Sequence, residues 1–165
     1  MFTRAELEAI EQDRLTHGPV VGGHPDLYSV VGGYPGLYFT AYPQHAFRTP
    51  SSEEYIRVTR ALRLAADNGI KFWCSAEWAA GWSGRESYFA PYLHGAQFEP
   101  ISEDEFNRIV QESSSELIAP LSLSLHAPNG FVGAILMYSI KSDFIVSLVA
   151  EYDDEFIHHF WESTA

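Results

Sequence analysis

The C-terminal third of the chain consists of apolar runs separated by short turns, and this pattern constrains the fold more than any other feature. Four runs are expected to be strands, at 117–127, 131–140, 144–152 and 155–161. The turns between them are predicted at Pro128-Asn129-Gly130, Lys141-Ser142-Asp143 and Asp153-Asp154. Strands joined by turns this short pair antiparallel, so we expect a C-terminal four-stranded meander.

Three segments carry helix-start signals, in which a serine or threonine is followed three residues later by glutamate. These signals predict helices beginning at Thr3, Ser51 and Ser102, the second of which ends at Asn68-Gly69. Two further strands are expected at 36–42 and 70–76, where aromatic and β-branched residues are dense. The predicted fold is therefore one α+β domain spanning 1–165, with about three helices and a largely antiparallel sheet.

A doubled segment, VVGGHPDLYSVVGGYPGLY, occupies residues 20–38. A phosphate-binding loop needs a helix start directly after its glycines, and neither copy has one. The prolines that follow the glycines also remove N–H donors. Two extended pieces separated by glycine turns favour a hairpin or a pair of stacked turns, and a ligand or partner contact is the alternative.

The net charge of −12 is concentrated in the second half of the chain. From residue 97 onward there are twelve acidic residues, and the only lysine or arginine residues are Lys141 and Arg108. Such a chain repels nucleic acid and anionic membrane surfaces, because both are bound through lysine and arginine. It attracts a basic macromolecule and accelerates encounter with it. A basic protein is therefore the expected partner, with no nucleic acid and no membrane.

The single cysteine, Cys74, excludes an internal disulfide and fits a reducing compartment. The N-terminal residues lack an apolar signal core, and the longest apolar runs are too short for a membrane span. We therefore expect a cytoplasmic protein. Since Cys74 lies in an apolar run, a small buried side chain is a simpler interpretation than a nucleophile.

No metal or cofactor is expected. His158 and His159 are adjacent, so in a strand they point to opposite faces and cannot chelate one ion together. The aromatic segment 75–95 suggests two alternative functions. It is either the pocket of a small-molecule sensor or, with Cys74, Glu77, Glu86 and His94, part of a small hydrolase.

Partner-binding residues are expected where acids and large aromatics alternate. Such a surface offers carboxylates to lysine and arginine, and rings that anchor the contact. The C-terminal candidates are Glu151, Tyr152, Asp153, Asp154, Glu155 and Trp161, and the aromatic segment adds Trp78 and Trp82.

A small acidic chain without a catalytic motif, rich in aromatics and ending in DDEFIHHFWESTA, resembles the immunity proteins of bacterial toxin–immunity systems. The resemblance is one of type and covers the C-terminal third best. It implies a non-catalytic protein that neutralises a nuclease-like toxin by occluding its active site. In this hypothesis Glu151, Asp153, Asp154 and Glu155 face the toxin's lysines and arginines, while Tyr152 and Trp161 act as anchors.

Overall fold

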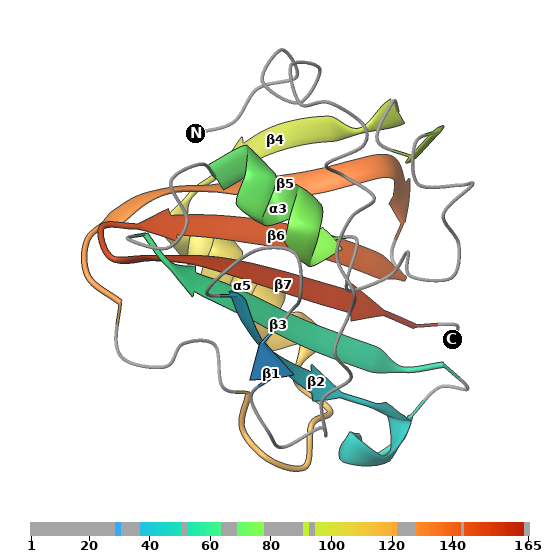
Figure 1. The fold of residues 1–165 in the computed structure, drawn as a ribbon. Coiled ribbons are helices and arrows are strands. Elements are labelled where there is room, and N and C mark those ends of the chain that lie inside the picture. The colour runs from blue at the N-terminus through green and yellow to red at the C-terminus, as the bar shows by residue number, and fades with distance from the viewer. Residues whose placement is uncertain are drawn as a thin grey trace.

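The computed structural model describes residues 29–30, 37–50, 53–63, 69–77, 91–92, 95–121, 128–142 and 144–163. The described strands form one seven-stranded antiparallel sheet in the order β1-β2-β3-β7-β6-β5-β4 (Figure 1). They are β1 (Ser29–Val30), β2 (Leu37–Tyr42), β3 (Tyr55–Leu62), β4 (Gln97–Ile101), β5 (Phe131–Ser142), β6 (Ile145–Tyr152) and β7 (Glu155–Glu162). The fold is thus α+β with an antiparallel sheet, as predicted.

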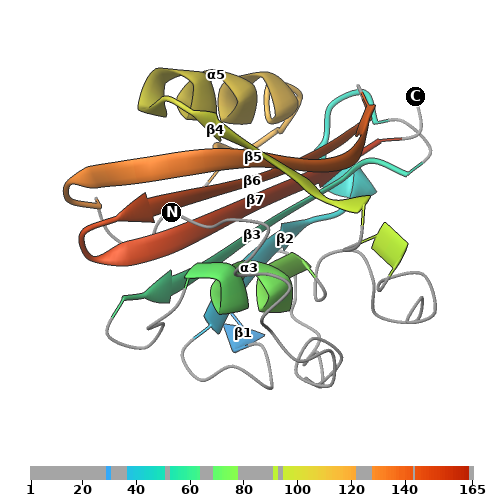
Figure 2. The same ribbon diagram turned by 90° about the horizontal axis from the view of Figure 1, so that it is seen from above.

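Two α-helices among the described residues pack on opposite faces of this sheet (Figure 2). They are α3 (Gly69–Glu77) and α5 (Glu103–Ser113), and a short 3-10 helix, η1 (Gln44–Ala46), follows β2. The predicted number of about three α-helices is therefore not supported in this part of the chain. The helix expected to begin at Thr3 lies outside the described residues.

The predicted meander is confirmed for its last three strands, β5, β6 and β7. β6 and β7 pair from Ile145↔Glu162 to Glu151↔Phe156, on either side of the expected Asp153-Asp154 turn. The first expected strand is wrong at 117–121, where Leu117 makes only an isolated bridge to Phe47. Residues 122–127 lie outside the described part of the chain.

β4 takes the place beside β5 that the first strand of the meander was expected to fill. Its sequence, QFEPI, is polar and contains Pro100, so it lacks the apolar alternation that identifies a strand. Proline is tolerated because β4 is the last strand of the described sheet and does not need an N–H on both sides.

The helix predicted at 51–68 is wrong, because its centre is strand β3. Residues 56–61 are all buried, since β3 lies inside the sheet with neighbours β2 and β7. Arg57 and Arg60, three positions apart, resemble the polar face of a helix in the sequence, but both are buried. The local pattern that indicates a strand here is the spacing of Ile56 and Val58, which are two positions apart.

The strand predicted at 70–76 is also wrong, because these residues belong to α3. Phe72 and Ala76, four positions apart, are both buried, as are Trp73 and Glu77. A four-residue spacing places side chains on one helical face. This face packs on the sheet, where the Phe72 ring stacks on Phe156 of β7 at 5.4 Å between ring centroids.

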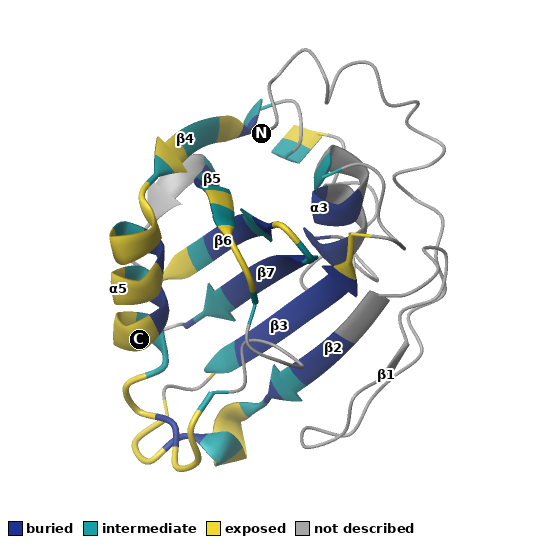
Figure 3. Ribbon diagram, turned by 90° about the vertical axis from the view of Figure 1, so that its left-hand side faces the viewer, coloured by how far each residue is buried: buried dark blue, intermediate teal, exposed yellow. Residues whose placement is uncertain are grey.

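The third predicted helix is confirmed as α5. Ser102 caps it, because its side chain accepts a hydrogen bond from the backbone N–H of Glu105 at 3.2 Å. Phe106 and Val110 are buried in an apolar core, together with Leu148 and Ile157 of the sheet. The opposite face of α5 is exposed, as the yellow residues in Figure 3 show.

The doubled segment is described only at residues 29–30 and 37–38, which flank and bound its second copy. Val30 and Tyr38, the first and last residues of that copy, pair antiparallel, as do Ser29 and Phe39, so the two ends of the second copy lie in neighbouring strands. The strand predicted at 36–42 is confirmed as β2. The glycine turns themselves lie outside the described residues.

Candidate functional site

The C-terminal partner-binding candidates are spread between the two ends of β7. Asp153 and Asp154 precede this strand, and Trp161 lies near its far end. At about 3.3 Å per residue, the strand separates the two groups by about 25 Å. The acid-plus-aromatic site expected from the local sequence is therefore divided by the extended backbone.

Asp153 and Asp154 are held by the turn at Asn129 and Gly130. The Asp153 backbone N–H donates to the carbonyl oxygens of Asn129 and Gly130, each at 2.9 Å. The Asp154 carboxylate accepts from the backbone N–H and the side-chain amide of Asn129, both at 3.1 Å. Asp153 is exposed and Asp154 is half-buried, so both acids lie at the surface in a fixed arrangement.

The other C-terminal candidates are less accessible. Glu155 and Tyr152 are only 1% and 6% exposed. Burial, with the Glu103 carboxylate as its hydrogen-bond partner, raises the pKa of Tyr152 to about 12. Glu151 forms an ion pair with Arg63 at 3.1 Å, so the molecule itself partly neutralises this charge.

Further acids lie close to the β6–β7 turn in the first turn of α5. The contact between Tyr152 and Glu103 joins the two elements, and Figure 2 shows them at the same end of the molecule. Glu103 and Asp104 are exposed. We call the surface formed by Glu103, Asp104, Asp153 and Asp154 the acidic end.

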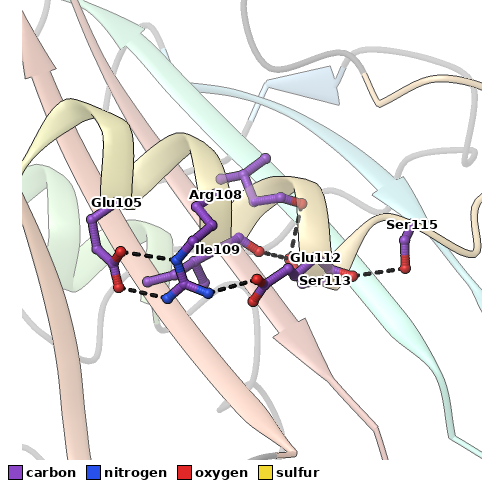
Figure 4. A network of polar contacts seen from close by, with 7 residues as sticks. Glu105, Arg108, Ile109, Glu112, Ser113 and Ser115 are labelled. Carbon is purple, nitrogen blue, oxygen red and sulfur yellow. Dashed lines mark hydrogen bonds and ion pairs between the residues drawn. The ribbon is translucent and has the colours of Figure 1, made fainter.

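Along α5, one arginine links two acids. Arg108 donates to Glu105, one helical turn earlier, and to Glu112, one turn later, with shortest distances of 2.6 Å (Figure 4). Arg108 offsets only one of these two negative charges, and Glu103 and Asp104 add two more in the first turn, so the helix stays acidic. The Ser-Glu-Asp-Glu run at 102–105, which predicts a helix start, is also the sequence signal of this acidic turn.

Trp161 is half-buried, and its indole N–H donates to the Glu54 carboxylate at 2.7 Å. The Ser163 hydroxyl donates to the other oxygen of the same carboxylate at 3.2 Å. Trp161 therefore has a polar partner within the chain. Trp78 and Trp82 lie outside the described residues, so their predicted role stays a prediction.

A buried polar cluster lies between α3 and the sheet. One oxygen of the Glu77 carboxylate accepts from Ser147 at 2.6 Å and from His158 at 2.8 Å, and the other accepts from the Tyr92 hydroxyl at 2.5 Å. Burial alone raises the pKa of Glu77, but these donors, His158 foremost, hold it below its usual range. The carboxylate is therefore charged in the folded protein.

This cluster lacks the geometry of a hydrolytic triad. In such a triad the histidine uses one ring nitrogen for the serine and the other for the acid. Here Nε2 of His158 faces both Ser147, at 3.1 Å, and Glu77, while Nδ1 has no hydrogen-bond partner among the described residues. All three side chains are at most 1% exposed. The cluster fastens α3 to the sheet.

The hydrolase hypothesis gains no support from the remaining candidates. Cys74 lies in α3, and Glu86 and His94 lie outside the described residues. No group of three metal-binding side chains occurs in the part of the chain that the structure describes. Within the same part, no helix is long and apolar enough to cross a membrane.

Comparison with protein-family models, with curated proteins and with solved structures gave no match for this chain.

Proposed function

We propose that this protein is a non-catalytic binding protein that neutralises a basic partner. We further propose that the partner is a nuclease-like bacterial toxin in the same cytoplasm, whose active site the protein occludes. The resemblance to immunity proteins suggests the toxin, and the acidic end supplies the physical argument for a basic partner. The lysines and arginines that a nuclease uses to hold phosphates are the groups that such a surface attracts.

The observation that carries the proposal is the exposed negative charge of the acidic end. Glu103, Asp104 and Asp153 are exposed there. Arg63, a cation at the same end, is already engaged by Glu151. The turns at Asn129-Gly130 and Asp153-Asp154 are hydrogen-bonded to each other, and we call them the paired turns. They hold Asp153 and Asp154 in place before binding, which lowers the entropy lost when a partner binds.

The test uses a panel of purified, catalytically inactivated cationic nuclease-toxin domains. We expect tight binding of one of them, and inhibition of the corresponding active domain. The Asp104→Lys/Asp153→Lys variant should bind about tenfold more slowly, because it removes electrostatic attraction at the contact. The association rate of this variant should also depend less on salt concentration.

The matched control is Glu53→Lys/Glu116→Lys, which changes the net charge equally at exposed positions near the other end of the sheet. It should retain most of the association rate. Equal losses in both variants would assign the effect to total charge and not to the acidic end. Absence of binding and inhibition across the panel would refute the proposed function.

A further inference from the structure

The end of the sheet opposite the acidic end exposes large apolar side chains. Ile118 is 62% exposed, and Phe144 and Ile145 are each 47% exposed. We call these three residues the apolar end. They are three of the five exposed large hydrophobic residues in the described part of the chain, and the remaining two, Leu62 and Val132, lie near the acidic end.

Phe144 directly precedes β6 and Ile145 is its first residue, and both lie beside the end of β7. The Phe144 carbonyl oxygen accepts from the Ser163 N–H at 2.8 Å, and Ile145 pairs with Glu162. These bonds fix the backbone that presents the two side chains. Half-buried Trp161 lies in the same stretch of β7, where it pairs with Val146 and packs against the apolar core. Exposed apolar groups gathered at one end of a sheet are typical of an interaction surface.

Ile118 lies at the same end of the sheet, where it is hydrogen-bonded to the segment that follows β2. Its N–H donates to the carbonyl oxygen of Ala46 in η1 at 2.9 Å. η1 follows β2, whose last residue, Tyr42, pairs with Ile56 near the start of β3. Figure 2 shows η1 and the C-terminal end of β7 at the same end of the molecule.

We propose that the apolar end is the interface of a homodimer. Charges of both signs surround it: Arg48, Glu53 and Glu116 are exposed there, so a two-fold contact can place the arginine of one copy against a glutamate of the other. At the acidic end the exposed cation Arg63 is already paired with Glu151 of the same copy. An apolar centre with a mixed-charge rim is the usual composition of a protein interface.

The net charge of −12 opposes self-association, and the position of the apolar end reduces this effect. A dimer joined there places its two acidic ends at its far tips, separated by about twice the length of β7, or about 50 Å. The Debye length in physiological salt is about 8 Å, so these charges are well screened from each other. Both acidic ends also stay free for a partner.

The test is sedimentation equilibrium of the full chain in physiological salt, across a wide range of protein concentrations. We expect a reversible rise from the monomer mass to the dimer mass. Phe144→Ser/Ile145→Ser should stay monomeric over the same range. The matched control, Leu62→Ser/Val132→Ser, removes exposed apolar groups near the acidic end and should dimerise like the wild type.

Several outcomes would overturn the proposal. They are a wild-type protein that is monomeric at every concentration, an equal loss of dimer in both variants, and a dimer unchanged in Phe144→Ser/Ile145→Ser. Circular dichroism establishes that each variant is folded. If the wild type is monomeric and only Phe144→Ser/Ile145→Ser loses binding to a nuclease domain, the surface belongs to the partner instead. No partner is needed for the dimer measurement, so its result is independent of the proposed function.

Discussion

His158 and His159 are consecutive in β7, yet they bind helices on opposite faces of the sheet. Nε2 of His158 lies 2.8 Å from the Glu77 carboxylate of α3, and Nε2 of His159 lies 2.7 Å from the Ser113 hydroxyl of α5. This arrangement arises because successive side chains of a strand point to opposite faces of the sheet. One dipeptide therefore fastens both described helices to the sheet through buried polar contacts.

Glu77→Gln is expected to destabilise the fold by about 3 kcal/mol, because it removes a buried carboxylate that accepts hydrogen bonds from three donors. Chemical denaturation measures this loss. Glu53→Gln, at an exposed position, should change the free energy of unfolding by less than about 0.5 kcal/mol. In a double-mutant cycle with His158→Leu, the two side chains should show a coupling of at least about 1 kcal/mol. Additive effects would contradict the contact.

Stability should fall as the pH is lowered from 6.5, in part because of His159. Burial, with His158 nearby, lowers the pKa of His159 from 6.5 to about 3, so only the unfolded chain binds this proton between these values. One such proton changes the free energy of unfolding by up to about 1.4 kcal/mol per pH unit. His159→Leu should reduce the slope measured by denaturation between pH 6 and 5 by most of this amount.

Between pH 6 and 5 the contribution of His159 to the pH dependence of stability can be measured apart from that of Glu77. Because the folded pKa of Glu77 is lowered, its contribution is present above its unfolded value of 4.5 and is lost only as the pH falls below it. An unchanged slope in His159→Leu would show that the histidine takes up its proton in the folded state. A Ser113→Ala variant keeps the histidine buried and should retain the wild-type slope.

Gly130→Ala should destabilise the paired turns of the acidic end. Gly130 has a φ of +55°, and an added Cβ would lie 1.9 Å from a carboxylate oxygen of Asp153. We expect a loss of about 1 to 3 kcal/mol, measured by thermal unfolding. Adding Asp153→Ala removes the clashing atoms and should restore part of the stability, leaving the backbone penalty. If the double variant is no more stable than Gly130→Ala, the clash with Asp153 is not a cause of the loss.

Ser102→Ala should weaken α5 by about 1 kcal/mol, because the backbone N–H of Glu105 loses its capping acceptor. The helix carries part of the acidic end, so the variant also tests whether partner binding depends on its first turn. Ser102→Asp keeps a capping oxygen and should retain stability. If Ser102→Ala and Ser102→Asp unfold alike, the cap contributes nothing measurable.

Local patterns identified the elements whose partners lie nearby in the chain. The capping signal at Ser102 located α5, and the turn at Asp153-Asp154 located the β6–β7 hairpin. The reversed assignments arose because β3 is buried at six consecutive positions and α3 turns an aromatic face to the sheet. Burial on both faces removes the polar alternation that marks a strand, and an aromatic helix face resembles a β-sequence.

The sequence by itself determined the antiparallel C-terminal hairpins, the capped acidic helix and the excess of negative charge, since each depends on residues a few positions apart. Only the tertiary structure decided which charges are available, by burying Glu155 and pairing Glu151 with Arg63. It also separated Trp161 from the acidic turn and brought Glu77 to His158, 81 positions away. The physical reason is that a strand spreads its residues along its length, while a sheet joins distant strands side by side.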